Sequence, residues 1–105
     1  MGYCTISAKG KRHTGTYREF EETGEIGDWW IDEKRASIYI MIPTNPPHPE
    51  MPPKANPTRW PYRDPLPNGA VWQFNGDLDK PTLTPSLHWV NMWHGWLRAG
   101  ELISC

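Results

Sequence analysis

The chain has 105 residues and a formal net charge of -1, from 11 basic and 12 acidic side chains. This balance argues against a strong nucleic-acid footprint, which needs a clustered basic excess. No run approaches the roughly 20 apolar residues that a membrane span needs. We therefore expect one domain over residues 1–105, with neither a nucleic-acid partner nor a membrane partner.

The two cysteines, Cys4 and Cys105, lie near the two ends of the chain. Domain ends often lie close together, so a disulfide between them is conceivable, although two cysteines make no disulfide framework. The first residues lack the apolar run of a signal peptide. We expect a cytoplasmic protein with both thiols reduced.

Residues 1–27 are polar, with scattered β-type residues that predict one or two short strands. Residues 28–43 predict a hairpin. Its first strand is Trp29 to Ile31, its turn is the charged run at residues 32–35, and its second strand ends at Pro43. The second strand is apolar on both faces, which indicates a buried central strand, with a short buried helix as the alternative.

Residues 43–69 contain ten of the twelve prolines. Proline lacks an N–H and has a fixed φ, so this segment is predicted to form neither a helix nor a central strand. We expect a long proline-rich loop that Trp60 and Tyr62 hold against the body of the domain. A proline-rich ligand for the groove of a partner is the alternative.

Residues 70–104 predict a compact β unit, which we expect to carry the functional surface. Four strands are expected, at residues 70–74, 86–90, 93–97 and 101–104, with turns at 75–77, 91–92 and 99–100. The predicted fold is mainly β, as an antiparallel sheet or sandwich. Neither a phosphate-binding glycine loop nor a dinucleotide fingerprint occurs, and we expect no cofactor.

Strand parity brings three candidate catalytic residues to one face of this unit. Ser86 and His88 share a face of one predicted strand, and His94 shares a face of the next with Trp96. If the strands pair around the turn at 91–92, Ser86, His88 and His94 converge. A serine with a histidine in hydrogen-bond reach is the minimal nucleophile–base pair, although such residues on a strand are also typical of ordinary polar surface.

Two further interpretations concern the same strands. His88 and His94, with Asp77 or Glu101, could supply zinc ligands, but no tight ligand motif is present and no metal is predicted. Gly95 directly follows His94 and indicates that a neighbouring chain or a ligand approaches the backbone closely.

The motifs of this unit resemble those of a known family. They are residues 72–77 (WQFNGD), 80–86 (KPTLTPS), 93–97 (WHGWL) and 100–102 (GEL). The pattern resembles a family of short phage and prophage proteins, often labelled ammonia monooxygenase, a label that nothing in this sequence supports. A related domain is the peptidase-like component of bacterial ubiquitin-like conjugation operons. The long proline-rich segment departs from the family pattern.

The resemblance implies a hydrolase, most simply a serine peptidase, with Ser86 as nucleophile and His94 as base. It leaves Asp77 as the candidate acid that orients His94. The candidate substrate-binding residues around this pair are Lys80, Thr82, His88, Trp93 and Trp96, and the Thr82 hydroxyl is also a candidate oxyanion donor.

The implied partner is a host protein or a ubiquitin-like tail, in the host cytoplasm if a phage encodes the chain. The oligomeric state is open. The rival hypothesis is a non-catalytic phage-encoded binding or anti-defence protein that sequesters a host protein or a small molecule. The seven tryptophans and the proline-rich arm favour that alternative.

Overall fold

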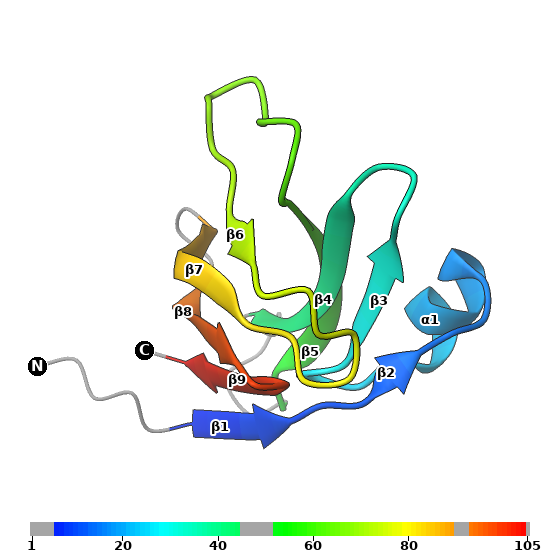
Figure 1. Ribbon diagram of the computed structural model, residues 1–105. Coiled ribbons are helices and arrows are strands. Elements are labelled where there is room, and N and C mark those ends of the chain that lie inside the picture. The colour runs from blue at the N-terminus through cyan, green and yellow to red at the C-terminus, as the bar shows by residue number, and fades with distance from the viewer. Residues whose placement is uncertain (1–5, 45–51, 90–92, 105) are drawn as a thin grey trace, which may run out of the picture.

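The computed structural model describes residues 6–44, 52–89 and 93–104. Cys4 and Cys105, whose thiols were expected to be reduced, lie outside the described residues. So do the turn expected at residues 91–92 and part of the proline-rich segment. Within them, the chain forms two sheets and one short helix (Figure 1).

The five-stranded sheet carries the motifs of the last third of the chain. Its order is β1 (Ile6–Lys9), β9 (Glu101–Ser104), β8 (Trp93–Arg98), β7 (Leu83–Trp89) and β6 (Gln73–Phe74). All its pairings are antiparallel. The strands expected at 86–90, 93–97 and 101–104 thus match β7, β8 and β9. The first strand of this unit is shorter than predicted, because only Gln73 and Phe74 pair with β7.

The four-stranded sheet has the order β2 (Arg12–His13), β3 (Trp29–Asp32), β4 (Ser37–Thr44) and β5 (Lys54–Pro61). β3 and β4 form the predicted antiparallel hairpin, and β4 lies between β3 and β5 as a central strand. β2 pairs with β3 in parallel. The chain passes from one sheet to the other at Gly10, where an added Cβ would lie 1.8 Å from the carbonyl oxygen of Gly27.

The long proline-rich loop predicted at residues 43–69 contains a strand that was not predicted. β5 is an eight-residue strand inside this segment, and it pairs with the whole length of β4. It lies at the edge of its sheet among the described residues, where a proline costs no interstrand hydrogen bond on the open side. Trp60 holds it in place, since its side chain is buried in the core.

Helix α1 (Tyr17–Thr23) was not predicted, because Tyr17 and its neighbours are β-type residues. Thr16 caps the helix: its hydroxyl accepts the N–H of Glu19 and also contacts the Glu19 carboxylate. This is the capping pattern of Thr followed three residues later by Glu, a signal present in the sequence. Tyr17 packs on Trp30 and Tyr39, so the helix covers the outer face of the four-stranded sheet.

The two sheets share one hydrophobic core. Each contributes alternate side chains of its strands: Ile38, Ile40 and Ile42 from one sheet, and Leu83, Leu87, Leu97 and Leu102 from the other. Trp29, Trp60, Trp72 and Trp93 fill the space between them. The observed fold is therefore mainly β, as predicted. In the described part of the chain, no helix has the length and apolar character needed to cross a membrane.

Candidate active site

The outer face of β7 and β8 carries the predicted catalytic residues. Leu87 on β7 and Trp93, Gly95 and Leu97 on β8 are buried, so the alternate residues face outward. The outward residues of these strands include Ser86, His88, His94 and Trp96. The alternation that was read from the sequence is therefore the one that the structure has.

The register of β7 and β8 places the two histidines opposite each other. His88 pairs with His94 across the ladder, and their ring centroids lie 5.5 Å apart in an edge-to-face arrangement. Ser86 lies on the same strand as His88, two residues earlier. In a regular ladder His94 would be a diagonal neighbour of Ser86 on this face, but Ser86 itself has no partner in the pairing of β7 with β8.

The ladder is irregular just before this point. Leu83 pairs with Leu97, and Leu87 pairs with Gly95. Between these two pairs, β7 has three residues and β8 has one, so β7 bulges. Such a bulge re-aims side chains and interrupts the ladder, and bulges are frequent beside active sites. Ser86 lies inside it, one residue after the cis peptide bond between Thr84 and Pro85.

Ser86 is held through its backbone. Its carbonyl oxygen accepts a hydrogen bond of 3.1 Å from the indole N–H of Trp72. Its hydroxyl makes no hydrogen bond with any described residue, including His94. Catalytic hydrogen bonds are often long or unmade before a substrate binds.

The His94 ring packs against two other rings. It contacts both His88 and Trp96, with 5.2 Å between the His94 and Trp96 centroids. The guanidinium of Arg98 lies over the Trp96 ring at 5.5 Å. No carboxylate of the described residues hydrogen-bonds either histidine of this face, so the acid that would orient His94 is not assigned.

The structure separates Asp77 from His94. Asp77 lies in the turn after β6, and one of its carboxylate oxygens accepts the N–H groups of Asp79 and Lys80, each at 3.0 Å. This turn lies beyond the Leu83 end of β7, whereas His94 lies near the other end of that strand. Asp77 therefore shapes a turn and does not orient His94.

Lys80 and Thr82 lie at the same distant end. Lys80 is exposed and lines a hollow with Trp29 and Gly100. The Thr82 hydroxyl accepts the N–H of Ala99 at 2.8 Å and so stabilises the turn between β8 and β9. Neither residue is brought to Ser86.

Trp93 and Trp96 lie on opposite faces of β8. Trp93 is a core residue, and its indole N–H donates to the Ser104 hydroxyl at 2.8 Å. Trp96 faces outward and contacts His94. Of the five predicted substrate-binding residues, the structure thus brings His88 and Trp96 to the candidate site.

The zinc interpretation depends on additional ligands beside His88 and His94. In residues 6–44, 52–89 and 93–104, no group of three or more histidine, cysteine, aspartate or glutamate side chains comes together. Glu101 lies opposite Arg98 in the β8–β9 ladder, at the end of β8 away from His94. Asp77 lies in the turn after β6.

A cleft lined by tryptophans adjoins the candidate site, and the sequence analysis did not find it. It has a volume of about 470 Å³ and is lined by Trp60, Trp72 and Trp89, with Arg59, Leu66 and His88 at its margins. Trp60 packs edge-on against both other indoles. The signal in the sequence was the high tryptophan content, but its spacing does not show which indoles meet.

A buried hydrogen bond between a histidine and a carboxylate was also missed. The ring Nε2 of His13 lies 2.7 Å from a carboxylate oxygen of Asp28, which is 3% exposed. The same carboxylate accepts the N–H groups of Lys11 and Glu25. These contacts tie β2 and the segment after α1 to β3, on the sheet that does not carry Ser86.

The fold and the outer face together define a small two-sheet β protein with a serine and two histidines on adjacent strands. Residues 56–105 match the family model described as bacterial ubiquitination-like system serine protease (BubE). The match covers 50 of the 105 residues and includes Ser86, His88 and His94. It supports a relation to the peptidase of ubiquitin-like conjugation systems. No curated protein and no solved structure matches the chain.

Proposed function

We propose that this chain is a small serine peptidase in which Ser86 is the nucleophile and His94 is the general base. The observation that carries the proposal is the match of residues 56–105 to a serine protease family. The outer face of β7 and β8 supports it, because the matched segment places Ser86, His88 and His94 there.

The chemistry follows from these groups. The Ser86 hydroxyl attacks the scissile carbonyl, His94 takes its proton and then gives it to the leaving amine, and water releases the acyl group from Ser86. Backbone N–H groups near Ser86 are the candidate donors to the oxyanion. His88 lies against the His94 ring and positions it.

We propose a ubiquitin-like tail or its conjugate as the substrate, because the matched family is described as the serine protease of a ubiquitination-like system. The proposed setting is the cytoplasm of a bacterium, and of an infected host if the chain is encoded by a phage. The direct assay uses purified ubiquitin-like protein from such a system, extended by extra residues after its tail. Release of these residues measures cleavage.

A fluorophosphonate probe tests the nucleophile without knowledge of the substrate. Labelling is expected for the unmodified chain and is expected to be lost in Ser86→Ala. His94→Ala should slow labelling by about 100-fold or more, since a general base contributes roughly 10²–10⁴-fold. Thr84→Ala, which removes an exposed hydroxyl two residues away, is the matched control and should label at the normal rate.

The second candidate function is a peptide-binding protein without turnover. The specific observation that favours it is the tryptophan cleft, in which Trp89 is 40% exposed. Absence of labelling in a folded chain, together with saturable peptide binding, would replace the first proposal with the second.

A further inference from the structure

Three aromatic rings meet on the outer face of the four-stranded sheet, and we call them the aromatic trio. Tyr17 comes from helix α1, while Trp30 and Tyr39 are partners in the ladder of β3 and β4. The Tyr17 centroid lies 5.6 Å from that of Trp30 and 4.9 Å from that of Tyr39, and the last two lie 5.6 Å apart. Each side chain is half-buried, so the rings are fixed by packing and still reach the surface.

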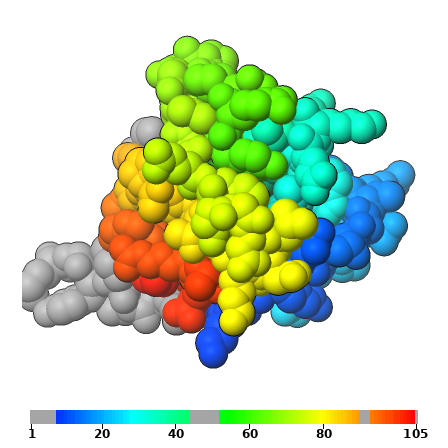
Figure 2. Space-filling model, viewed as in Figure 1, coloured from blue at the N-terminus to red at the C-terminus, as the bar shows by residue number. Residues whose placement is uncertain are grey.

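The trio lines a pocket together with two opposite charges. The pocket has a volume of about 350 Å³, and its other lining residues are Asp32 and Arg35. Asp32 is the last residue of β3, and Arg35 lies in the turn that leads to β4. Figure 2 shows helix α1 and this turn projecting on the same side of the molecule. The pocket therefore combines three rings, one carboxylate and one guanidinium.

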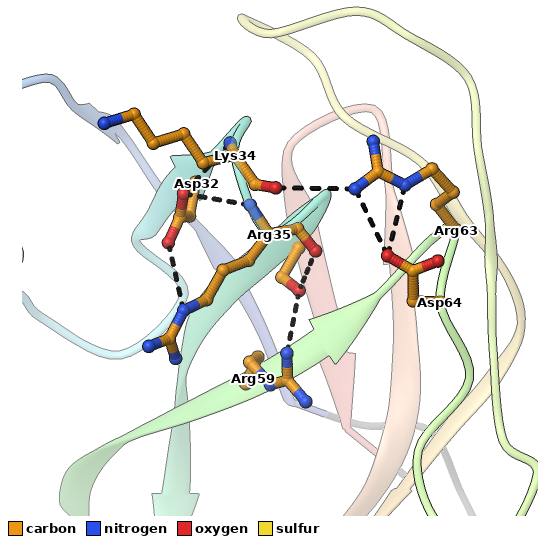
Figure 3. A network of polar contacts seen from close by, with 7 residues as sticks. Asp32, Lys34, Arg35, Arg59, Arg63 and Asp64 are labelled. Carbon is orange, nitrogen blue, oxygen red and sulfur yellow. Dashed lines mark hydrogen bonds and ion pairs between the residues drawn. The ribbon is translucent and has the colours of Figure 1, made fainter.

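The indole and the carboxylate of this pocket are held in place by the backbone. The Trp30 indole N–H donates to the Gly15 carbonyl at 2.8 Å. One oxygen of Asp32 accepts the N–H groups of Lys34 and Arg35, at 3.1 and 3.2 Å. Its other oxygen lies 3.9 Å from Nε of Arg35, whose side chain is 67% exposed (Figure 3). Such an exposed pair contributes little, so a ligand can separate these two charges at small cost.

The trio is suited to a cation, and no cation of the described chain occupies it. The face of an aromatic ring attracts a cation within about 6 Å of its centroid, and quaternary ammonium groups are recognised in this way. The Arg98 guanidinium lies over Trp96 on the other sheet, whereas no cation of residues 6–44, 52–89 and 93–104 lies over a ring of the trio. Burial and, after it, the nearby Glu21 carboxylate raise the pKa of the Tyr17 phenol. A second carboxylate thus lies near the trio, on the helix side.

Two guanidiniums lie on the side of the turn. Arg59 is opposite Tyr39 in the ladder of β4 and β5, and it donates to the Ser37 hydroxyl at 3.5 Å. That hydroxyl donates to the Arg35 carbonyl, so the Arg59 side chain is directed toward the turn (Figure 3). Guanidiniums bind carboxylates through strong, often paired hydrogen bonds. The positive charge beside the pocket is therefore suited to an anionic group of a ligand.

We propose that this pocket binds a small zwitterion that carries a quaternary ammonium group and a carboxylate. The trio receives the ammonium group, with Asp32 beside it, and the Arg35 guanidinium turns from Asp32 to the carboxylate of the ligand. The charges that line the pocket cancel, which fits a zwitterion better than a simple cation or anion. The pocket lies on the sheet that does not carry Ser86, so the inference does not depend on the proposed peptidase.

The test titrates the full-length, ¹⁵N-labelled chain with γ-butyrobetaine, in which three carbons separate a trimethylammonium group from a carboxylate. The Trp30 indole signal, assigned with Trp30→Phe, is expected to shift saturably. The signals of Trp72 and Trp93, which lie in the core between the sheets, are expected to stay unchanged. The isostere 5,5-dimethylhexanoate has carbon in place of the nitrogen. It should bind about tenfold more weakly, because it keeps the shape and loses the cation.

Two variants separate the two ends of the ligand. Arg35→Gln should weaken γ-butyrobetaine binding about fivefold, the upper end for an exposed ion pair. It should not weaken binding of propyltrimethylammonium, which lacks the carboxylate. Asp32→Asn should weaken both ligands, while its side-chain oxygen still accepts the N–H groups of the turn. Asp64→Asn is the matched control, because Asp64 pairs with Arg63 and does not line the pocket (Figure 3).

Three results would overturn the inference. The first is the absence of a saturable Trp30 shift in the folded, unmodified chain. The second is equal binding of γ-butyrobetaine and its carbon isostere, which would leave an apolar pocket without preference for a cation. The third is unchanged γ-butyrobetaine affinity in Arg35→Gln, which would remove the carboxylate from the ligand. Unchanged signals of the other indoles show that each variant is folded.

Discussion

Gly95 shows how one residue sets the distance between two strands. An added Cβ would lie 2.1 Å from the carbonyl oxygen of Ile103 on β9 and 2.4 Å from the Trp93 ring. The close approach expected from the sequence is therefore made by a neighbouring strand of the same chain. A backbone atom and a buried ring cannot both move aside cheaply.

Gly95→Ala should therefore lower the free energy of unfolding by about 3 kcal/mol, the upper part of the range for overpacking. Urea unfolding followed by circular dichroism measures it. Gly76→Ala is the control, since a Cβ there meets open space and only the positive φ of 83° opposes it. We expect it to cost about 1 kcal/mol. Equal losses for the two variants would contradict the close packing of β8 and β9.

The buried Asp28 carboxylate makes three hydrogen bonds with described residues. Its removal leaves His13 and the N–H groups of Lys11 and Glu25 without an acceptor. Asp28→Ala is expected to cost about 3 kcal/mol of unfolding free energy, because unpaired buried polar groups are expensive. Asp79→Ala removes a carboxylate that is 81% exposed and pairs with Arg12 at 3.5 Å. Urea unfolding should show no measurable change for this control, and a similar loss in both would contradict the account of Asp28.

Individual residues of the site were predictable to different degrees. The face shared by Ser86, His88 and His94 follows from strand parity, which is a local property of the sequence. The position of Asp77 could not be derived in the same way. Its carboxylate is satisfied within its own turn, and only the register of β6, β7 and β8 shows that the turn lies far from His94.

At the scale of elements, Trp72 fixes the strand that carries Ser86. It bridges the end of β5 and the bulged part of β7 through two hydrogen bonds. Trp72→Phe keeps the ring in the core and removes the indole donor. We expect a loss of about 1 kcal/mol in stability and a several-fold slower reaction of Ser86 with a fluorophosphonate.

Trp30→Phe separates these two effects. The Trp30 indole N–H donates to the carbonyl of Gly15 at 2.8 Å, so the variant also loses one hydrogen bond to a backbone oxygen. Its stability should fall similarly while its labelling rate stays normal. If both variants label at the same rate, Trp72 does not position Ser86.

Elements with strong local patterns were predicted, and those that depend on pairing partners were not. The hairpin of β3 and β4 follows from its apolar runs and charged turn. β5 was missed because its prolines argue against a strand until its place at a sheet edge is known. Helix α1 was missed because Tyr17 and its neighbours are β-type residues, and its one local signal is the Thr16–Glu19 capping pattern.

At the scale of the molecule, the residues that match the protease family depend on the rest of the chain. β5 to β9 bury their inner faces against Trp29, Ile38, Ile40 and Ile42, which lie outside residues 56–105. We therefore predict that a fragment of residues 56–105 lacks a cooperative thermal transition, whereas the full chain unfolds in one step. Scanning calorimetry of both measures this. Cooperative unfolding of the fragment would contradict the single-domain prediction.

The central claim is that Ser86 is a reactive nucleophile, and the position of a covalent adduct tests it most directly. The unmodified, folded chain is treated with a fluorophosphonate, and the adduct is located by tandem mass spectrometry. The account predicts one adduct per chain, on the Ser86 oxygen, that does not form after urea unfolding. An adduct on another residue, or no adduct on the folded chain, would contradict it.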